Sequence, residues 1–292
     1  PDEFAMSSAI ELRIDPRERT VGAGRVRRLL PYRERRMVGP FIFADVLGPE
    51  ELTAETPINI NAHPHIGLST VTYLFDGRMV HRDSTGAVQT VTPGAVNWMT
   101  AGSGVTHTER SHPDDLAGSH PIHGLQTWVA LPSDFEGAAP SFQHAAASEI
   151  PVATVGSSSV RVAVGSGWSV DSPIRTSSPL LLAEVRLHPE SPVPIVCSLP
   201  ELAVLCLSGD VRINGERVAS GQMVVLRQGS RSSLNGSGVA VVLGGEPVGK
   251  RHIWWNFVHS DPDRIEDAKA DWLEQRFPLV DNDHDPYVPL PA

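Results

Sequence analysis

The sequence predicts an all-β protein in which two small barrels follow one another and a single helix ends the chain. Three observations support this. Twenty-five glycines and 25 prolines divide the 292 residues into short segments, which favours sheets with many turns over helix bundles. Strand-like runs bounded by turn residues recur in both halves. Apolar residues recur at helical spacing only in a short segment near the C-terminus.

The first half contains short, regular strand-and-turn units typical of a sandwich or small barrel. Asp76-Gly77 and Pro93-Gly94 supply turns, and a further turn is predicted at 21–24. From Pro132 to about Gly167 the chain is rich in Ala, Ser and Pro, which indicates a connection between domains. We therefore predict one domain at 6–146 and a second at 147–292. The predicted strands of the first are 10–14, 40–47, 70–75, 79–83, 88–92, 96–100 and 123–131.

The second half repeats the β pattern and then changes to a helix. Turns are predicted at Ser208-Gly209-Asp210 and Asn214-Gly215. The helix is predicted over about 261–276, with Asp261 as the acceptor cap, Pro262 in its first turn and Pro278 as its stop. Its apolar stripe, expected to pack on a barrel, is Ile265, Ala268, Trp272 and Leu273. The strands predicted here are 181–187, 203–207, 211–213, 223–226 and 239–243.

Two pairs of polar residues at i, i+2 spacing point to a metal site. His63 and His65 form one pair, and His107 and Glu109 form the other. Residues i and i+2 share one face of a strand, so two such strands in one barrel would bring three imidazoles and a carboxylate together. Such a donor set suits Fe(II), Mn, Co, Ni, Cu or Zn, and not Mg or Ca. Eight of the twelve histidines lie between His63 and His144, which favours this interpretation over a merely hydrogen-bonded polar interior.

Composition limits the other functions. The net charge of −10 gives the chain no overall attraction to nucleic acid, and the arginine cluster within 13–36 is interpreted as a solvated face. Cys197 and Cys206 are expected to be buried free thiols in a reducing, cytoplasmic environment. No apolar run is long enough for a membrane span, and no signal peptide is expected. Pro1–Ala5 is interpreted as a cloning remnant before Met6.

Five ordered motifs resemble the pirin family of the cupin superfamily, in particular its bacterial members. They are Val38–Phe43 (VGPFIF), His63-Pro64-His65, Asn97–Gly102 (NWMTAG), His107-Thr108-Glu109 and His123–Trp128 (HGLQTW). The resemblance implies two tandem cupin (jelly-roll) barrels with one metal ion, usually iron, in the first. It implies His63, His65, His107 and Glu109 as the ligands. Many members carry Arg and Glu shortly after the H-x-H motif, whereas this chain has Ile66 and Ser69 at those positions.

The resemblance also implies candidate functions. Some pirins have quercetin 2,3-dioxygenase activity, which would need Fe(II), O2 and a flavonol-like aromatic substrate, with Glu109 as a candidate base. Others act as regulators through protein contacts, so a non-catalytic, redox-responsive iron protein is the alternative. A detoxification or storage role is a third option. Since two barrels in one chain can satisfy the contact through which many cupins dimerise, we expect a monomer.

Residues near the ligands are candidates for supporting roles. Those that could orient an imidazole through its other nitrogen are Asn61, Thr106, His123 and Gln126. Those that could line an aromatic-accepting pocket are Phe75, Trp98 and Met99, although each could equally be ordinary core. The remaining histidines of this region are expected on the surface or in loops: His81, His112, His120 and His144.

Overall fold

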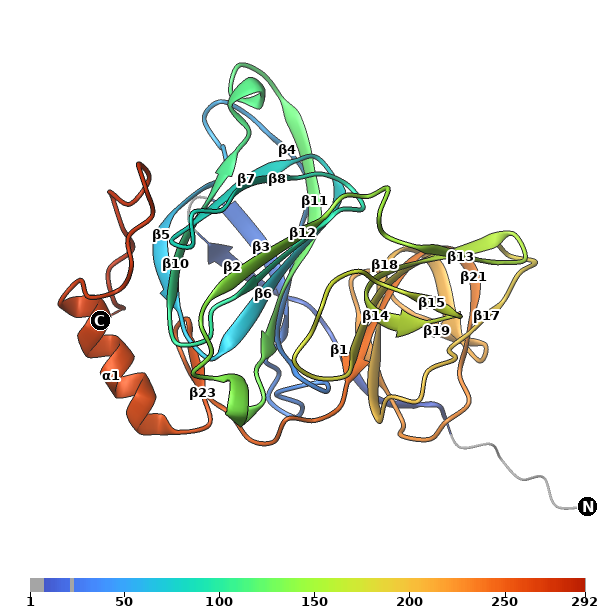
Figure 1. Cartoon of the computed structure of the whole chain (residues 1–292). Coiled ribbons are helices and arrows are strands. Elements are labelled where there is room, and N and C mark those ends of the chain that lie inside the picture. The colour runs from blue at the N-terminus through green and yellow to red at the C-terminus, as the bar shows by residue number, and fades with distance from the viewer. Residues whose placement is uncertain (1–7, 22–23, 292) are drawn as a thin grey trace, which may run out of the picture.

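The computed structural model describes residues 8–21 and 24–291, and it confirms the all-β fold class with one C-terminal helix. Two barrels lie side by side, and the helix covers the side of the first barrel that faces away from the second (Figure 1). The expectation for Pro1–Ala5 and most of the turn predicted at 21–24 fall outside the described residues. Within the described ranges, no helix has the length and apolarity needed to cross a membrane.

The N-terminal barrel consists of two sheets, and the candidate metal site lies between them. The seven-stranded sheet contains, in spatial order, β12 (Ser141–Ala145), β9 (Val96–Thr100), β6 (Leu68–Asp76), β11 (His120–Ala130), β4 (Phe41–Leu52), β3 (Gly24–Leu30) and β2 (Arg17–Val21). The four-stranded sheet contains β5 (Asn59–His65), β10 (Val105–Ser111), β7 (Met79–Asp83) and β8 (Val88–Val91). Two short 3-10 helices, η1 (Pro113–Asp115) and η2 (Ser133–Phe135), lie in the connections.

The C-terminal barrel is one ten-stranded antiparallel sheet around its own apolar core. Its main path is β1 (Ile10–Ile14), β20 (Met223–Leu226), β18 (Glu201–Ile213), β21 (Ser233–Gly245), β16 (Leu180–Leu187), β14 (Ser158–Gly167) and β13 (Val152–Val155). The short strands β15 (Val170–Asp171), β17 (Val193–Pro194) and β19 (Glu216–Val218) pair with β14, β21 and β18. Cys206 is a buried free thiol in this core, whereas Cys197 is only half-buried.

One predicted turn in this barrel is wrong and another is confirmed. Ser208-Gly209-Asp210 does not end a strand, because β18 continues to Ile213 with a register shift between Cys206 and Ser208. Gly209, at φ +88°, lies just after this bulge and stays paired with Gly238, so the glycine does not end the strand. Asn214 and Gly215, both at positive φ, do form the turn between β18 and β19.

Both ends of the chain cross to the opposite barrel. β1 pairs with β20 of the C-terminal barrel. The segment 246–291, called here the C-terminal tail, returns to the N-terminal barrel with β22 (His252–Trp254), β23 (Phe257–His259) and α1 (Pro262–Leu273). Val258 N donates to the carbonyl of Ile66 at 3.2 Å, next to His65 at the end of β5. The division at 146/147 stays a prediction, and the tail predicted for the second domain packs on the first.

Helix α1 begins as predicted and ends earlier. Asp261 accepts a hydrogen bond from Asp263 N at 2.9 Å as the N-cap, and Pro262 follows it. The helix ends at Leu273, three residues before the predicted end, because Gln275 turns the chain at φ +54°. Leu273 is therefore 72% exposed and does not belong to the packing stripe. The residues that do pack, against Ile66 and Phe257, are Ile265, Ala268 and Trp272.

A shared apolar core joins the two barrels. It includes Phe41 and Val129 from the N-terminal barrel and Leu182 and Leu205 from the C-terminal barrel. Across it, the Tyr73 hydroxyl donates to Glu184 at 2.5 Å. The seven-stranded sheet thus has one face toward the second barrel and the other toward the cavity of its own barrel.

Candidate metal centre

The four-stranded sheet brings the two predicted polar pairs together. In the register of β10 and β5, His107 lies opposite His63 and Val105 lies opposite His65. Alternation along each strand points the side chains of both pairs into the barrel. The spacing in the sequence therefore predicted correctly that the three imidazoles meet.

His63, His65 and His107 form a compact, buried group. One ring nitrogen from each lies within 4.8 Å of the others, and the Nε2 atoms of His65 and His107 are 3.1 Å apart. In the part of the chain that the structure describes, this is the single group of three or more His, Cys, Asp or Glu side chains so arranged.

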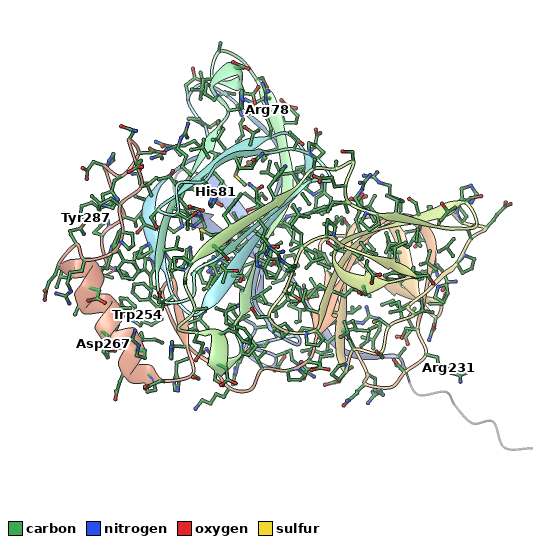
Figure 2. All side chains as sticks on the ribbon, in the orientation of Figure 1. Arg78, His81, Arg231, Trp254, Asp267 and Tyr287 are labelled. Atoms are coloured by element: carbon green, nitrogen blue, oxygen red, sulfur yellow. The ribbon has the colours of Figure 1, made fainter. Side chains whose placement is uncertain are left out.

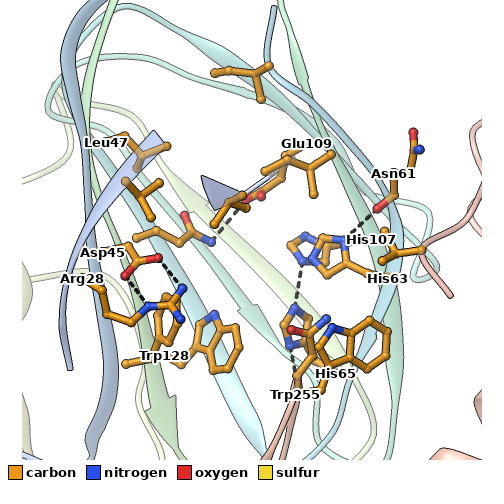
Figure 3. Close-up of a pocket in the computed structure, with 18 of the residues that line it drawn as sticks. Arg28, Asp45, Leu47, Asn61, His63, His65, His107, Glu109, Trp128 and Trp255 are labelled. Carbon is orange, nitrogen blue, oxygen red and sulfur yellow. Dashed lines mark hydrogen bonds and ion pairs between the residues drawn. The ribbon is translucent and has the colours of Figure 1, made fainter. Parts of the chain in front are cut away.

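Hydrogen bonds fix the orientation of two of these rings and determine which ring nitrogen carries the hydrogen. His63 Nδ1 donates to the carbonyl oxygen of Asn61 at 2.8 Å, and His65 Nδ1 donates to the carbonyl oxygen of Asn256 at 3.1 Å (Figure 3). In a neutral imidazole the other nitrogen, Nε2, then carries a lone pair. Lone pairs aimed at one point repel each other unless a cation lies between them. The residues present therefore fit a metal ion bound through nitrogen.

Burial keeps the three imidazoles neutral. It lowers the pKa of His63 to about 4, although the Asn61 carbonyl partly opposes this shift. Burial, reinforced by neighbouring imidazoles, holds the pKa values of His65 and His107 well below the usual value. Only a neutral ring can bind a metal, so burial keeps these three imidazoles in the form that could do so near neutral pH.

Glu109 lies on the same face but makes a different contact. Its side chain is buried and lines the same cavity, and Oε1 accepts a hydrogen bond from Gln126 Nε2 at 3.2 Å. Figure 3 shows the Glu109 carboxylate pointing away from the imidazoles, and the dashed line at this carboxylate is its bond with Gln126. Burial raises its pKa, although the hydrogen bond from Gln126 partly opposes this shift.

The imidazoles face a cavity of about 680 Å³ with one aromatic wall. Phe43 and Trp128 stack at 4.1 Å, and Trp128 makes an edge contact with His65 at 5.1 Å. At the other end of the wall, the Arg28 guanidinium lies over Phe43 at 4.4 Å and pairs with both oxygens of Asp45, at 2.9 and 2.8 Å. The wall thus runs from the three imidazoles to the ion pair of Arg28 and Asp45.

The C-terminal tail completes this cavity. Trp255, Asn256 and Val288 line it, and Gly67 shows how closely the tail approaches. At φ +68°, a Cβ on Gly67 would lie 1.8 Å from the Val258 carbonyl oxygen. Only glycine allows the tail to lie directly against the backbone next to His65.

A further set of contacts, called here the Asp283 clamp, ties the C-terminal tail to β10. Asp283 accepts hydrogen bonds from Arg110 at 2.8 Å and from Thr108 at 2.6 Å, both on β10. Arg110 also donates to the side chain of Asn61 at 3.0 Å, and the Asn61 carbonyl holds His63. The tail therefore supports His63 through this network and His65 through Asn256.

Two of the four residues predicted to orient imidazoles lie in the cavity. Asn61 contacts His63 as predicted, but through its backbone carbonyl. Gln126 holds Glu109 and no imidazole. Thr106 does not line the cavity, because it alternates with His107 and faces away. His123 is an odd number of residues from Gln126 on β11, so it faces the other side and packs against Phe75 at 5.0 Å.

The structure places the predicted pocket residues elsewhere. Trp98 belongs to the core between the barrels, and Phe75 packs at its edge. Met99 is buried in a small cluster with Ala101 and Val105. None of the three lines the cavity. The aromatic wall is built from Phe43 and Trp128 instead, since these side chains point to the cavity face of their strands.

Other expectations for this region need correction. His81 and His120 are not surface residues, because they are 4% and 8% exposed, whereas His112 and His144 are partly exposed. Ile66 and Ser69, which depart from the family pattern, do not line the cavity. Ile66 anchors the tail and Ser69 bonds with Thr100 at 3.0 Å. The sequence did contain a signal for His81, because His81 and Asp83 form a third i, i+2 polar pair on a predicted strand.

The N-terminal barrel has two sheets and three convergent imidazoles, and a second barrel follows it in the same chain. This architecture is that of a two-domain cupin with one candidate metal centre. Family models agree with this class: Pirin matches residues 23–129, and the Pirin C-terminal cupin domain matches residues 182–278. The chain is 42% identical to a pirin-like protein from Caulobacter vibrioides, over 97% of this chain and 99% of that protein. It belongs to the pirin family.

Two further relatives carry an activity in their names. A Pseudomonas aeruginosa protein named provisionally as a quercetin 2,3-dioxygenase is 35% identical, over 96% of this chain and 89% of its own. A crystal structure of quercetin 2,3-dioxygenase from Acinetobacter baumannii superposes with a TM-score of 0.88 at 30% identity. That match covers 96% of this chain and 95% of the other.

Proposed function

We propose that this protein is an Fe(II)-dependent dioxygenase of the quercetin 2,3-dioxygenase type, which cleaves a ring of flavonol-like substrates with O2. The cavity of about 680 Å³ that opens onto three neutral imidazoles carries the proposal. Cavities for ligands of drug-like size lie between about 300 and 1,000 Å³. The names of the Pseudomonas and Acinetobacter relatives support the same reaction.

The proposed ligand set is His63, His65, His107 and Glu109. Glu109 would join it by turning its buried carboxylate from Gln126 toward the imidazoles on the same sheet face. Histidine and carboxylate ligands with open positions are typical of non-haem Fe(II) sites that bind substrate and O2. Zn, Mn, Co, Ni or Cu would accept the same donors, so the metal bound by the purified protein should be measured directly.

The proposed mechanism gives one task to the metal and two to the surrounding residues. A bound metal would supply Lewis acidity toward the 3-hydroxyl oxygen of a flavonol. Glu109 would take the hydroxyl proton at Oε2 after turning back from the imidazoles to Gln126, which donates to Oε1, and burial favours a carboxyl group that can hold a proton. The stacked Phe43 and Trp128 would hold the planar substrate against the wall and exclude water.

Oxygen uptake by anaerobically prepared, Fe(II)-loaded protein on addition of quercetin tests the proposal. Wild-type protein should consume O2, and the His63→Ala variant should not. Iron content measured on the same samples separates a failure of chemistry from a failure of loading. No uptake by protein with bound iron would refute the dioxygenase assignment for quercetin.

A further inference from the structure

Strand β7 contributes a third polar pair to the face of the four-stranded sheet that points into the barrel. Asp83 lies opposite His107 in the register, and His81 lies opposite Glu109. Both side chains are buried, at 4% exposure for His81 and 2% for Asp83, and His81 lies inside the N-terminal barrel (Figure 2). Neither residue belongs to the proposed ligand set or lines the cavity. Their contacts lead instead to one ligand, His107.

The Asp83 carboxylate accepts hydrogen bonds on both of its oxygens. Oδ1 accepts from Thr85 N at 2.8 Å, from the Thr85 hydroxyl at 2.6 Å and from Ala87 N at 3.4 Å. Oδ2 lies 2.7 Å from His81 Nε2. Since a carboxylate can only accept, His81 Nε2 must carry the hydrogen in this contact.

This hydrogen determines the direction of the next bond. A neutral His81 with hydrogen on Nε2 has a lone pair on Nδ1. That nitrogen lies 3.4 Å from His107 Nδ1, which must then donate. Phe142 stacks on the His81 ring at 4.7 Å with an interplanar angle of 22°, and so holds the plane of that ring. The chain of hydrogen bonds from Asp83 through His81 to His107 is called here the relay. His107 is left with its lone pair on Nε2, the atom 3.1 Å from His65 Nε2.

We propose that Asp83 and His81 are positioning residues that hold His107 in the tautomer with hydrogen on Nδ1 and aim its Nε2 at the metal. The proposal rests on the metal site of the proposed function. It gives His107 the support that the carbonyls of Asn61 and Asn256 give the other two imidazoles. The Nδ1 of each proposed imidazole ligand then donates to a fixed acceptor. For His107 this acceptor is the His81 side chain, which can be substituted.

The Asp83→Asn variant tests the direction of the relay. The amide oxygen should stay with the three donors of Thr85 and Ala87, which leaves the amide nitrogen to donate to His81 Nε2. His81 would then carry its hydrogen on Nδ1 and donate to His107, whose own hydrogen would move to Nε2, where the metal should bind. We expect Co(II) affinity, measured by competition with a chelator, to fall about 10- to 100-fold.

Nitrogen and carbon NMR of the histidine rings reads the tautomer without metal or activity. In metal-free wild-type protein, His107 should carry hydrogen on Nδ1, and in Asp83→Asn on Nε2. Three variants separate orientation from packing. Thr85→Val removes a hydrogen bond from the same turn but leaves the direction of the His81–Asp83 bond unchanged. It should therefore bind Co(II) like wild type. His81→Gln can accept from His107 and donate to Asp83, so it should retain most affinity, whereas His81→Leu should lose it.

The outcomes for this relay and for the metal site are distinct. Wild-type affinity in both Asp83→Asn and His81→Leu, or a His107 tautomer that Asp83→Asn leaves unchanged, would overturn the relay. A wild-type protein that binds no Co(II) would overturn the metal site, while the ring spectra would still decide the tautomer of His107. Thermal unfolding of each variant shows that the comparison is made between folded proteins.

Discussion

Replacing Asp283 with asparagine should loosen the C-terminal tail and, through it, the candidate metal centre. Asp283 accepts from Arg110 at 2.8 Å and from Thr108 at 2.6 Å, and Arg82 lies 3.7 Å away. Asparagine keeps the size of the side chain but removes its charge and one acceptor oxygen. Arg110, whose side chain is 18% exposed, would lose its ion pair.

The magnitude follows from these contacts. A hydrogen bond to a charged group contributes about 1.5–3 kcal/mol, and partial exposure places this pair toward the middle of that range. A loss of about 2 kcal/mol from the free energy of tail opening corresponds to about 30-fold faster hydrogen exchange. The increase should appear in peptides from the tail and from β5, because Arg110 also holds Asn61.

Exchange measured by mass spectrometry, together with Co(II) affinity, tests this expectation. Asp281→Asn is the matched control, since it neutralises an exposed aspartate two residues away. Exchange in Asp283→Asn equal to that of wild type and of the control would show that the clamp does not hold the tail.

The same clamp predicts a pH dependence. Burial favours the neutral acid, but hydrogen bonds from Arg110 and Thr108 outweigh it and hold the pKa of Asp283 below its usual value. The stabilisation is therefore present above the unfolded pKa of about 3.9 and is lost as pH falls through the lower folded value. Fluorescence of the tail tryptophans, followed from neutral pH to about pH 3 in wild type and Asp283→Asn, should show an acid transition that the variant lacks.

Three further substitutions have defined outcomes. Glu109→Ala should weaken metal binding about tenfold or more by calorimetry, and unchanged metal content would remove Glu109 from the ligand set. Tyr73→Phe should lower the free energy of unfolding in urea by about 1–2 kcal/mol, because Glu184 loses a hydrogen bond across the barrels; a midpoint equal to wild type would contradict this. Gly67→Ala should displace the tail and cost about 2 kcal/mol or more, since a Cβ would meet the Val258 carbonyl at 1.8 Å. Wild-type stability and tail exchange in that variant would show that the backbone contact is unimportant.

Strand alternation explains both the successes and the failures of prediction from the sequence. The rule that i and i+2 share a face is local, so it placed His63, His65 and His107 together correctly. It does not say which face is the interior. Trp98 was therefore expected in the pocket, although its strand turns that side chain toward the second barrel.

Partners distant in sequence could not be predicted from local patterns. His81 and Asp83 acquire a role only because β7 lies beside β10, and that neighbour relation is set by the whole sheet. Asn256 is 191 residues from the imidazole that it supports. The end of α1 was missed for a similar reason, since the turn at Gln275 belongs to the docking of the tail.

The crossing of the tail sets an order in which the site can be completed during synthesis. A ribosome makes the strands that carry His63, His65 and His107 first, and a domain can begin to fold while the rest of the chain is still being made. The carbonyl of Asn256 and the carboxylate of Asp283 emerge only after the entire second barrel. A nascent chain holding all three imidazoles still lacks two of the groups that aim them, so the proposed metal site is complete only after the C-terminal tail has been made.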